Sequence, residues 1–192
     1  MLKNSLRGVL AFASVIAFVL TASAQNAETV YGLTVPAQVD RLTRGPPIDY
    51  ESKSPGLGYA FRFSGRPGWT VDVYIYDFQL TSIPADLNAP VVIDQFTRAQ
   101  NDIFELGQRG GYANVKATGK FEVARAGKPA FHCATFNYLR GEKRDIDVDS
   151  FLCLTTWNGK FVKFRMTGVK GSITRADAIS FVTAWIPLLW PK

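Results

Sequence analysis

Residues 59–76 read YAFRFSGRPGWTVDVYIY, and this stretch decides the fold. Apolar and polar side chains alternate on both sides of its central Gly-Arg-Pro-Gly segment. Such alternation predicts two strands, and the short glycine-containing loop predicts that they form a hairpin. A three-residue loop pairs Phe63 with Val71 on one face and Arg62 with Asp72 on the other. Because this register matches apolar with apolar and positive with negative, we expect an antiparallel sheet.

The periodicity changes after Pro84. Apolar residues then recur at intervals of three and four, which predicts an amphipathic helix at about 89–109. Its expected inner stripe is Val92, Phe96, Ala99, Ile103 and Leu106. Further alternating segments predict four strands, at about 113–125, 129–140, 147–157 and 160–168. A second helix is expected to begin near Thr174, where Asp177 three residues later completes an acidic variant of the capping box.

The resulting order is β-β-α-β-β-β-β-α, which is typical of an α+β fold. We expect an antiparallel sheet of about six strands with two main helices; if the helices cover different faces, both faces of the sheet are buried. Residues 57–192 would form this single globular domain, and residues 25–56, interrupted by Pro46 and Pro47, an irregular leader. The predicted core comprises Tyr59, Phe61, Phe63, Val71, Val73, Ile75, Phe96, Ile103, Val162, Phe164, Ile179 and Val182.

The beginning of the chain has the three parts of an export signal. Lys3 and Arg7 precede an apolar run at residues 8–20, and Ala-Ser-Ala at residues 22–24 fits a cleavage site. The run is shorter than the roughly 20 residues that a membrane-spanning helix needs. We therefore expect residues 1–24 to be a signal peptide, Gln25 to begin a periplasmic or secreted protein, and no integral membrane anchor to remain after cleavage.

Composition limits the expected partners. Lys3 and Arg7 account for two of the 22 basic side chains, so 20 basic residues would face 16 acidic ones in the mature chain, a net charge of +4. This excess slightly favours anionic ligands. The basic residues are scattered rather than clustered, so nucleic acid is not an expected partner.

The two cysteines fit an oxidising compartment. Cys133 and Cys153 each lie ten residues from Lys143, the centre of a predicted turn. In a symmetric hairpin they sit opposite each other and can form a disulfide. The alternative is a pair of buried free thiols.

The polar face of the first hairpin is the best candidate for a binding site. Tyr74 and Tyr76 share this face with Arg62 and Asp72, and a groove with a few aromatic rings and one Arg is a common form of small binding site. The alternative is a second core face covered by a helix.

No catalytic, cofactor-binding or metal-binding residue is predicted. His132, the only histidine, adjoins Cys133, but neighbouring strand residues point to opposite faces, so they cannot form a dyad. A local hydrogen bond is the expected role of His132.

Three aspartates resemble the start of a calcium-binding loop. Asp145, Asp147 and Asp149 have the right spacing, but Ser150 and Thr156 stand where such a loop needs Gly and Glu. We expect a charged strand end that discourages edge pairing, with weak cation binding as the alternative.

The order of elements, with the Gly-x-x-Gly-Trp segment at Gly65–Trp69, resembles the PsbP-like fold family over residues 57–190. Members of that family are mostly non-catalytic binding or assembly factors, so the resemblance implies a non-enzyme with no cofactor. It carries over no functional residue.

The functional hypothesis is a non-catalytic exported domain that binds a cell-envelope protein or a small ligand. Two alternatives stay open. One is an envelope hydrolase that uses carboxylates alone, and the other is a basic surface protein that binds anionic lipid or glycan.

Overall fold

The computed structural model of the protein describes residues 28–191, so the predicted signal peptide and Gln25 lie outside the described residues. The helices are α1 (Pro90–Gln108), α2 (Arg175–Thr183) and α3 (Ile186–Leu189). The strands are β1 (Glu28–Val30), β2 (Leu33–Val35), β3 (Gln38–Val39), β4 (Leu42–Asp49), β5 (Tyr59–Ser64), β6 (Trp69–Tyr76), β7 (Ala113–Arg125), β8 (Lys128–Arg140), β9 (Ile146–Trp157) and β10 (Lys160–Val169).

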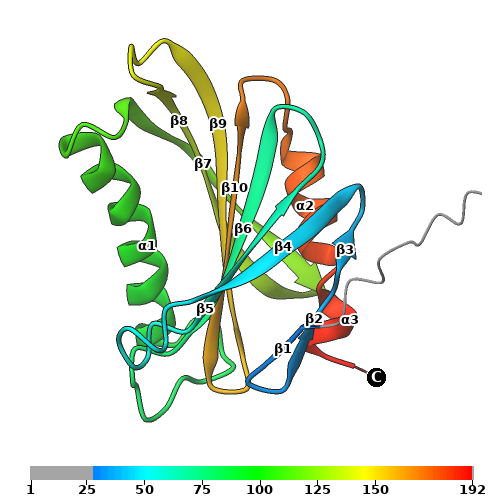
Figure 1. Cartoon of the computed structure of the whole chain (residues 1–192). Coiled ribbons are helices and arrows are strands. Elements are labelled where there is room, and N and C mark those ends of the chain that lie inside the picture. The colour runs from blue at the N-terminus through cyan, green and yellow to red at the C-terminus, as the bar shows by residue number, and fades with distance from the viewer. Residues whose placement is uncertain (1–27, 192) are drawn as a thin grey trace, which may run out of the picture.

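The main sheet has eight strands in the order β3-β4-β5-β6-β10-β9-β8-β7, and every pairing is antiparallel. The short strands β1 and β2 form a separate hairpin. Helix α1 lies on one face of the sheet, and α2 and α3 lie on the other (Figure 1). The α+β fold with helices on different faces is therefore confirmed. Within the described part of the chain, none of the helices has the length and apolar character that crossing a membrane requires.

The first hairpin has the predicted register. Phe63 pairs with Val71 and Arg62 with Asp72 across β5 and β6. Gly68 has a φ of +87°, the left-handed conformation that closes the loop at little steric cost. Because the side chains alternate from here outward, this turn determines which residues of both strands face α1.

Helix α1 begins and ends within one residue of the predicted positions, and α2 begins where predicted. Helix α1 has Ala89 at its N-cap and Pro90 in its first turn, where the missing N–H of proline is tolerated. Helix α2 carries the predicted capping box: the Thr174 hydroxyl accepts from the Asp177 N–H, and the Asp177 carboxylate accepts from the Thr174 N–H.

The N-terminal segment differs from the prediction. Where residues 25–56 were expected to be irregular, the structure contains β1 to β4, and β3 and β4 enlarge the sheet from about six strands to eight. The register between β4 and β5 shifts between Arg44 and Pro47. A bulge accommodates prolines that cannot donate to a regular ladder, which is why Pro46 and Pro47 did not end the strand.

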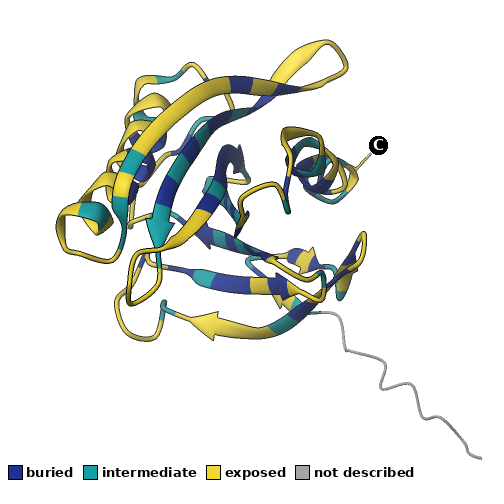
Figure 2. Cartoon of the chain, turned by 90° about the horizontal axis from the view of Figure 1, so that it is seen from above, coloured by how far each residue is buried: buried dark blue, intermediate teal, exposed yellow. Residues whose placement is uncertain are grey.

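Two apolar cores lie on opposite faces of the sheet (Figure 2). The larger packs beneath α2 and α3 and contains most of the predicted core residues. The smaller packs beneath α1 and includes Phe96 and Ile103. Ten of the twelve predicted core residues are buried, and the other two, Tyr59 and Ile179, are partly buried against the larger core.

The predicted disulfide joins β8 and β9. Cys133 and Cys153 face each other in the register, with their Cα atoms 4.1 Å apart. Both residues are buried in the larger core. The bond therefore clamps the β8–β9 hairpin, which lies next to the edge strand β7.

Candidate binding groove

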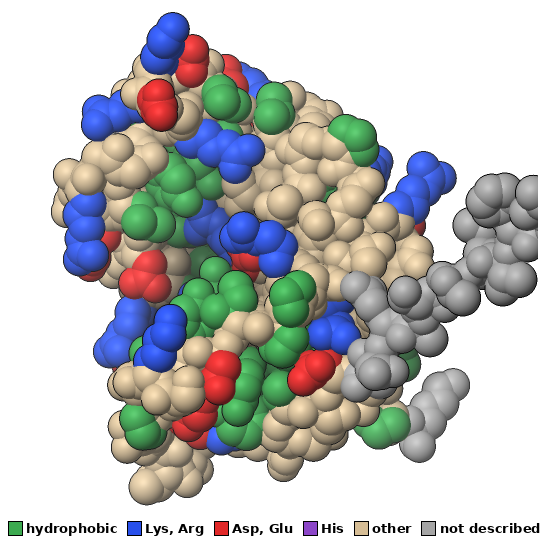
Figure 3. Space-filling view, in the orientation of Figure 1, with side chains coloured by type: hydrophobic (Ala, Val, Ile, Leu, Met, Phe, Trp, Pro, Cys, Tyr) green, Lys and Arg blue, Asp and Glu red, His purple; other side chains and the backbone are tan. Residues whose placement is uncertain are grey.

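A groove of about 790 Å³ lies between the C-terminal half of α1 and the sheet. Figure 3 shows Lys and Arg side chains gathered around a hollow on this side of the molecule. Five basic, two acidic and several apolar residues line the groove. The lining residues are Arg62, Ser64, Arg66, Gly68, Trp69, Thr70, Asp72, Tyr74, Ala99, Asp102, Ile103, Leu106, Tyr112, Arg140, Leu152, Lys163, Arg165 and Thr167.

The sheet wall of the groove is polar because of strand alternation. Asp72 lies opposite Arg62 on one side and opposite Arg165 on the other. Tyr74 lies opposite Lys163 in the adjacent row. Residues directly opposite each other in neighbouring strands present their side chains to the same face. Three strands therefore present three cations, one carboxylate and one aromatic ring toward α1.

The helix wall of the groove is mostly apolar. Ala99, Ile103 and Leu106 face it from one stripe of α1, and Asp102 is the acidic exception. Ala99 and Ile103 are buried, whereas Leu106 is 43% exposed. Leu106, in the last turn of the predicted stripe, is therefore the most accessible of the three.

Two of the basic residues are already neutralised. Arg62 binds Asp72 with both ends of its guanidinium, Nε to Oδ1 at 2.7 Å and Nη2 to Oδ2 at 3.0 Å. Arg66 pairs with Asp177 at 2.9 Å, outside the groove. Among residues 28–191, no carboxylate forms an ion pair with Arg140, Lys163 or Arg165. These three residues form the groove's cationic set.

Lys163 lies within the groove wall rather than on its rim. Its Nζ atom is 4.5 Å from the centre of the Tyr74 ring and 5.5 Å from that of Tyr76. Burial lowers the pKa of Lys163 below its usual value, against the opposing influence of Asp102. Burial also raises the pKa of Tyr74 to about 12, so the phenol stays neutral at physiological pH. Lys163 is therefore a cation with aromatic contacts but without a counter-ion.

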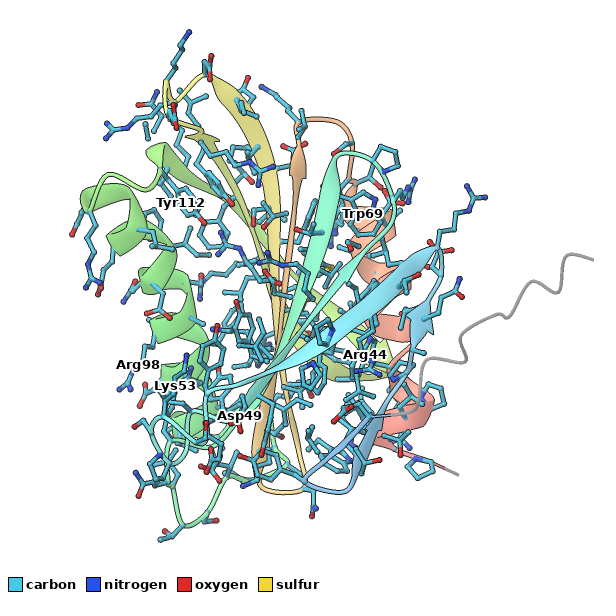
Figure 4. The ribbon with its side chains drawn as sticks, viewed as in Figure 1. Arg44, Asp49, Lys53, Trp69, Arg98 and Tyr112 are labelled. Atoms are coloured by element: carbon cyan, nitrogen blue, oxygen red, sulfur yellow. A yellow bond between two sulfur atoms is a disulfide. The ribbon has the colours of Figure 1, made fainter. Side chains whose placement is uncertain are left out.

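Arg165 is held by an aromatic stack. Its Nη2 donates to the Tyr138 hydroxyl at 3.2 Å, and the Tyr138 ring stacks on Tyr112 with ring centres 4.1 Å apart. Tyr112, labelled in Figure 4, follows α1 and brings this stack to the end of the groove. The Arg165 Nε is buried and has no hydrogen-bond partner. The structure thus fixes the guanidinium while leaving part of its donor capacity unused.

Three of the four residues predicted to form a groove line it: Arg62, Asp72 and Tyr74. Tyr76 does not. It is buried in the core beneath α1, where its hydroxyl accepts from the Gln95 side chain at 2.9 Å. A groove and a second core are the two alternatives for this face, and the structure has both: they share Ala99 and Ile103 of α1.

The sequence-based prediction missed Lys163, Arg165, Arg140 and Tyr112. The alternation in residues 160–168 already places Lys163 and Arg165 on one face. What it does not reveal is that β10 pairs with β6, since these strands are separated by α1 and three further strands. Only this long-range pairing brings the two cations beside Asp72 and Tyr74.

The other candidate residues lie elsewhere. His132 contacts the Leu87 carbonyl through Nε2 at 3.1 Å and Glu122 of the adjacent strand β7 through Nδ1 at 3.2 Å, so its partners are distant in sequence. Asp149 accepts from the Asn137 side chain and the Gly171 N–H, and Asp147 pairs with Lys170. Within the described residues, no group of three His, Cys, Asp or Glu side chains could hold a metal ion.

No protein-family model and no curated protein matches the sequence. Among solved structures, the chain is similar to the cyanobacterial PsbP of Synechocystis sp. PCC 6803, with 16% identity, a TM-score of 0.43, and coverage of 82% of this chain and 95% of that one. It is also similar to the Ran-binding protein Mog1p of Saccharomyces cerevisiae, with 13% identity, a TM-score of 0.40, and coverage of 82% of that chain and 83% of this one. A PsbP protein is thus among its structural neighbours, as the order of elements implied.

Proposed function

We propose that this protein is an exported, non-catalytic domain that binds a small organic ligand in the groove between α1 and the sheet. The observation that carries the proposal is the groove itself, with a volume of about 790 Å³, one apolar wall and one polar wall. Ligand sites in proteins are concave, largely apolar and supplied with a few convergent polar groups.

Export is supported by two independent features. The N-terminal sequence has the composition of a cleavable signal. The paired cysteines suit an oxidising compartment, where disulfides persist.

The groove's chemistry favours binding over turnover. Asp72 has both carboxylate oxygens engaged by Arg62. No His, Cys or Glu is among the lining residues. General acid–base catalysis needs a group free to exchange a proton with the substrate. Asp102 is the lining carboxylate without an ion-pair partner among the described residues, and a single acid does not supply a carboxylate pair.

Binding of the uncharged dye N-phenyl-1-naphthylamine to the mature protein tests the proposal. We expect saturable fluorescence enhancement with one dye per protein. Thr70→Trp should abolish it, because Thr70 lines the groove and the larger side chain fills the space. Thr81→Trp, at an exposed loop position, is the matched control and should bind the dye as wild type does.

Two results would overturn the proposal. Absence of saturable dye binding, or binding that is the same in both Trp variants, would show that the groove is not a ligand site. Robust turnover in a hydrolase screen that disappears in Asp102→Asn would show that the domain is an enzyme.

A further inference from the structure

We infer that the ligand is an amphipathic organic anion, with one acidic head group bound by Arg140, Lys163 and Arg165 and an apolar body lying against α1. This inference rests on the proposed function and specifies its ligand class. It depends on the balance of charge in the groove and on the separation of its two walls.

The charge balance leaves a positive excess inside the groove. Removing the neutralised pairs Arg62–Asp72 and Arg66–Asp177 leaves three cations facing one carboxylate, Asp102. Such an excess in a recessed, partly desolvated site attracts anions more strongly than the same charges on an open surface.

The donors suit an acidic head group. Arg165 lines the groove and bonds Tyr138 through Nη2, and a planar guanidinium matches a carboxylate or a phosphate. Lys163, two residues away on the same face of β10, adds a point charge. Their half-buried positions place the cations in the groove wall, where a free molecule reaches them and the flat surface of a bilayer does not.

The opposite wall suits an apolar body. Ala99, Ile103 and Leu106 offer aliphatic surface along α1. A ligand between the two walls would therefore place its acid toward β10 and its hydrocarbon or aromatic part toward the helix. That part of the ligand would cover Leu106, which is 43% exposed.

Two dyes of similar shape but different charge test whether the groove prefers an anion. 8-Anilinonaphthalene-1-sulfonate differs from N-phenyl-1-naphthylamine by its sulfonate. We expect wild type to bind the sulfonate dye about tenfold more tightly, since a hydrogen bond to a charged group contributes about that factor. Lys163→Gln and Arg165→Gln should each lose this preference while binding the neutral dye within about twofold of wild type.

Two further variants sharpen the test. Asp102→Asn removes the competing carboxylate and should raise affinity for the anionic dye by about threefold, the opposite direction from the Lys and Arg variants. Lys128→Gln, an exposed residue outside the groove, makes the same charge change as Lys163→Gln and should leave the preference intact. Competition should follow charge: dodecanoate and dodecyl phosphate displace the anionic dye, and dodecyltrimethylammonium does not.

The outcomes distinguish the inference from the function on which it rests. Equal binding of both dyes, unchanged by Lys163→Gln and Arg165→Gln, would overturn the inference and leave the groove a ligand site. Binding of neither dye would overturn both. Sedimentation with phosphatidylglycerol vesicles that is lost in Lys163→Gln would replace the free anion with a membrane surface as the partner.

Discussion

The two faces of the sheet are both covered by helices, yet they are packed differently. Beneath α2 and α3, aromatic rings fill the space. The Phe164 ring packs edge to face against Phe181, with ring centres 6.3 Å apart, and against Trp185, with ring centres 5.3 Å apart. Phe181 and Trp185 also pack against Phe63. Beneath α1, the apolar core extends along the helix from Val92 to Ile103, and the C-terminal half of the helix also borders a groove lined with charges.

One strand shows how this difference arises. In β10, Phe164 is buried beneath α2, while its neighbours Lys163 and Arg165 face α1. A strand must place successive side chains on opposite faces, so the same few residues build a closed core on one side and a cationic wall on the other. We infer that the closed face beneath α2 and α3 supplies stability, whereas the face beneath α1 is free to carry function. Four predictions test this division, from the largest expected effect to the smallest.

The largest effect is expected on the closed face. Phe164→Ala should lower the free energy of unfolding by about 3–5 kcal/mol, because it removes a fully buried ring from a packed cluster. Thr167→Ala, in the same strand but facing the groove, should change it by less than about 1 kcal/mol. Chemical denaturation of both variants measures the contrast. Similar losses at the two positions would mean that the faces do not differ in packing.

The disulfide gives the second largest effect. Replacing both Cys133 and Cys153 with Ala should lower the free energy of unfolding by about 3 kcal/mol, because the bond closes a loop of 20 residues in the unfolded chain. Reductant should bring wild type down toward the double variant and leave the variant unchanged. Two free thiols in denatured, unreduced wild-type protein would contradict this prediction.

The local sequence pattern predicted the strand register and the disulfide of the closed face well. The alternation in residues 59–76 and the Gly-Arg-Pro-Gly loop specified the register of β5 and β6, and the symmetry around Lys143 specified the disulfide. These features depend on neighbours in sequence, for which side-chain period and turn chemistry suffice. Strand β4 was missed because a bulge accommodates the two prolines that argued against a strand there.

The groove was predicted only in part, for a different physical reason. Arg62, Asp72 and Tyr74 belong to one hairpin, so their common face follows from local register. Lys163 and Arg165 join them through the pairing of β10 with β6, which depends on the topology of the whole sheet. Tyr76 has the same alternation as Tyr74, and only the position of α1 decides which of the two is covered.

The third prediction concerns acid sensitivity at the start of α2. The Thr174 hydroxyl, the Thr174 N–H and Arg66 hold the pKa of Asp177 below its usual value, with partial burial opposing them. Because the folded-state pKa is the lower one, the stabilisation is complete above the unfolded pKa of 3.8 and is lost as the pH falls through the folded pKa.

Asp177→Asn should therefore be less stable than wild type by about 1 kcal/mol at pH 7. The difference between the two proteins should shrink as the pH falls below 3.8 and the wild-type carboxyl also becomes neutral. Thermal unfolding at several pH values measures it. A difference that stays constant from pH 7 to pH 2 would show that the charge of Asp177 contributes nothing to the cap.

The smallest effect on the free energy of unfolding is expected at Lys163. We expect this residue to lower the stability of the fold while contributing to ligand binding. Burial lowers the folded-state pKa of Lys163 from its usual 10.5, so the buried cation disfavours folding at neutral pH. Lys163→Met keeps an unbranched side chain on the Tyr74 ring and removes the charge. It should be more stable than wild type at pH 7, by less than about 1 kcal/mol, while losing the preference for the anionic dye.

The sign of the pH dependence is the control for Lys163→Met. Wild type should gain stability relative to the variant as the pH rises through the folded pKa toward 10.5, because the unfolded chain still binds the proton that the folded chain releases. Above the unfolded pKa the lysine is neutral in both states, and the difference due to charge disappears. Loss of more than about 1 kcal/mol in Lys163→Met at pH 7 would show that the contacts of the ammonium with Tyr74 and Tyr76 outweigh its desolvation. In that case Lys163 would be a structural residue although it lies on the groove face. The division between a stabilising face and a binding face would then not hold in β10.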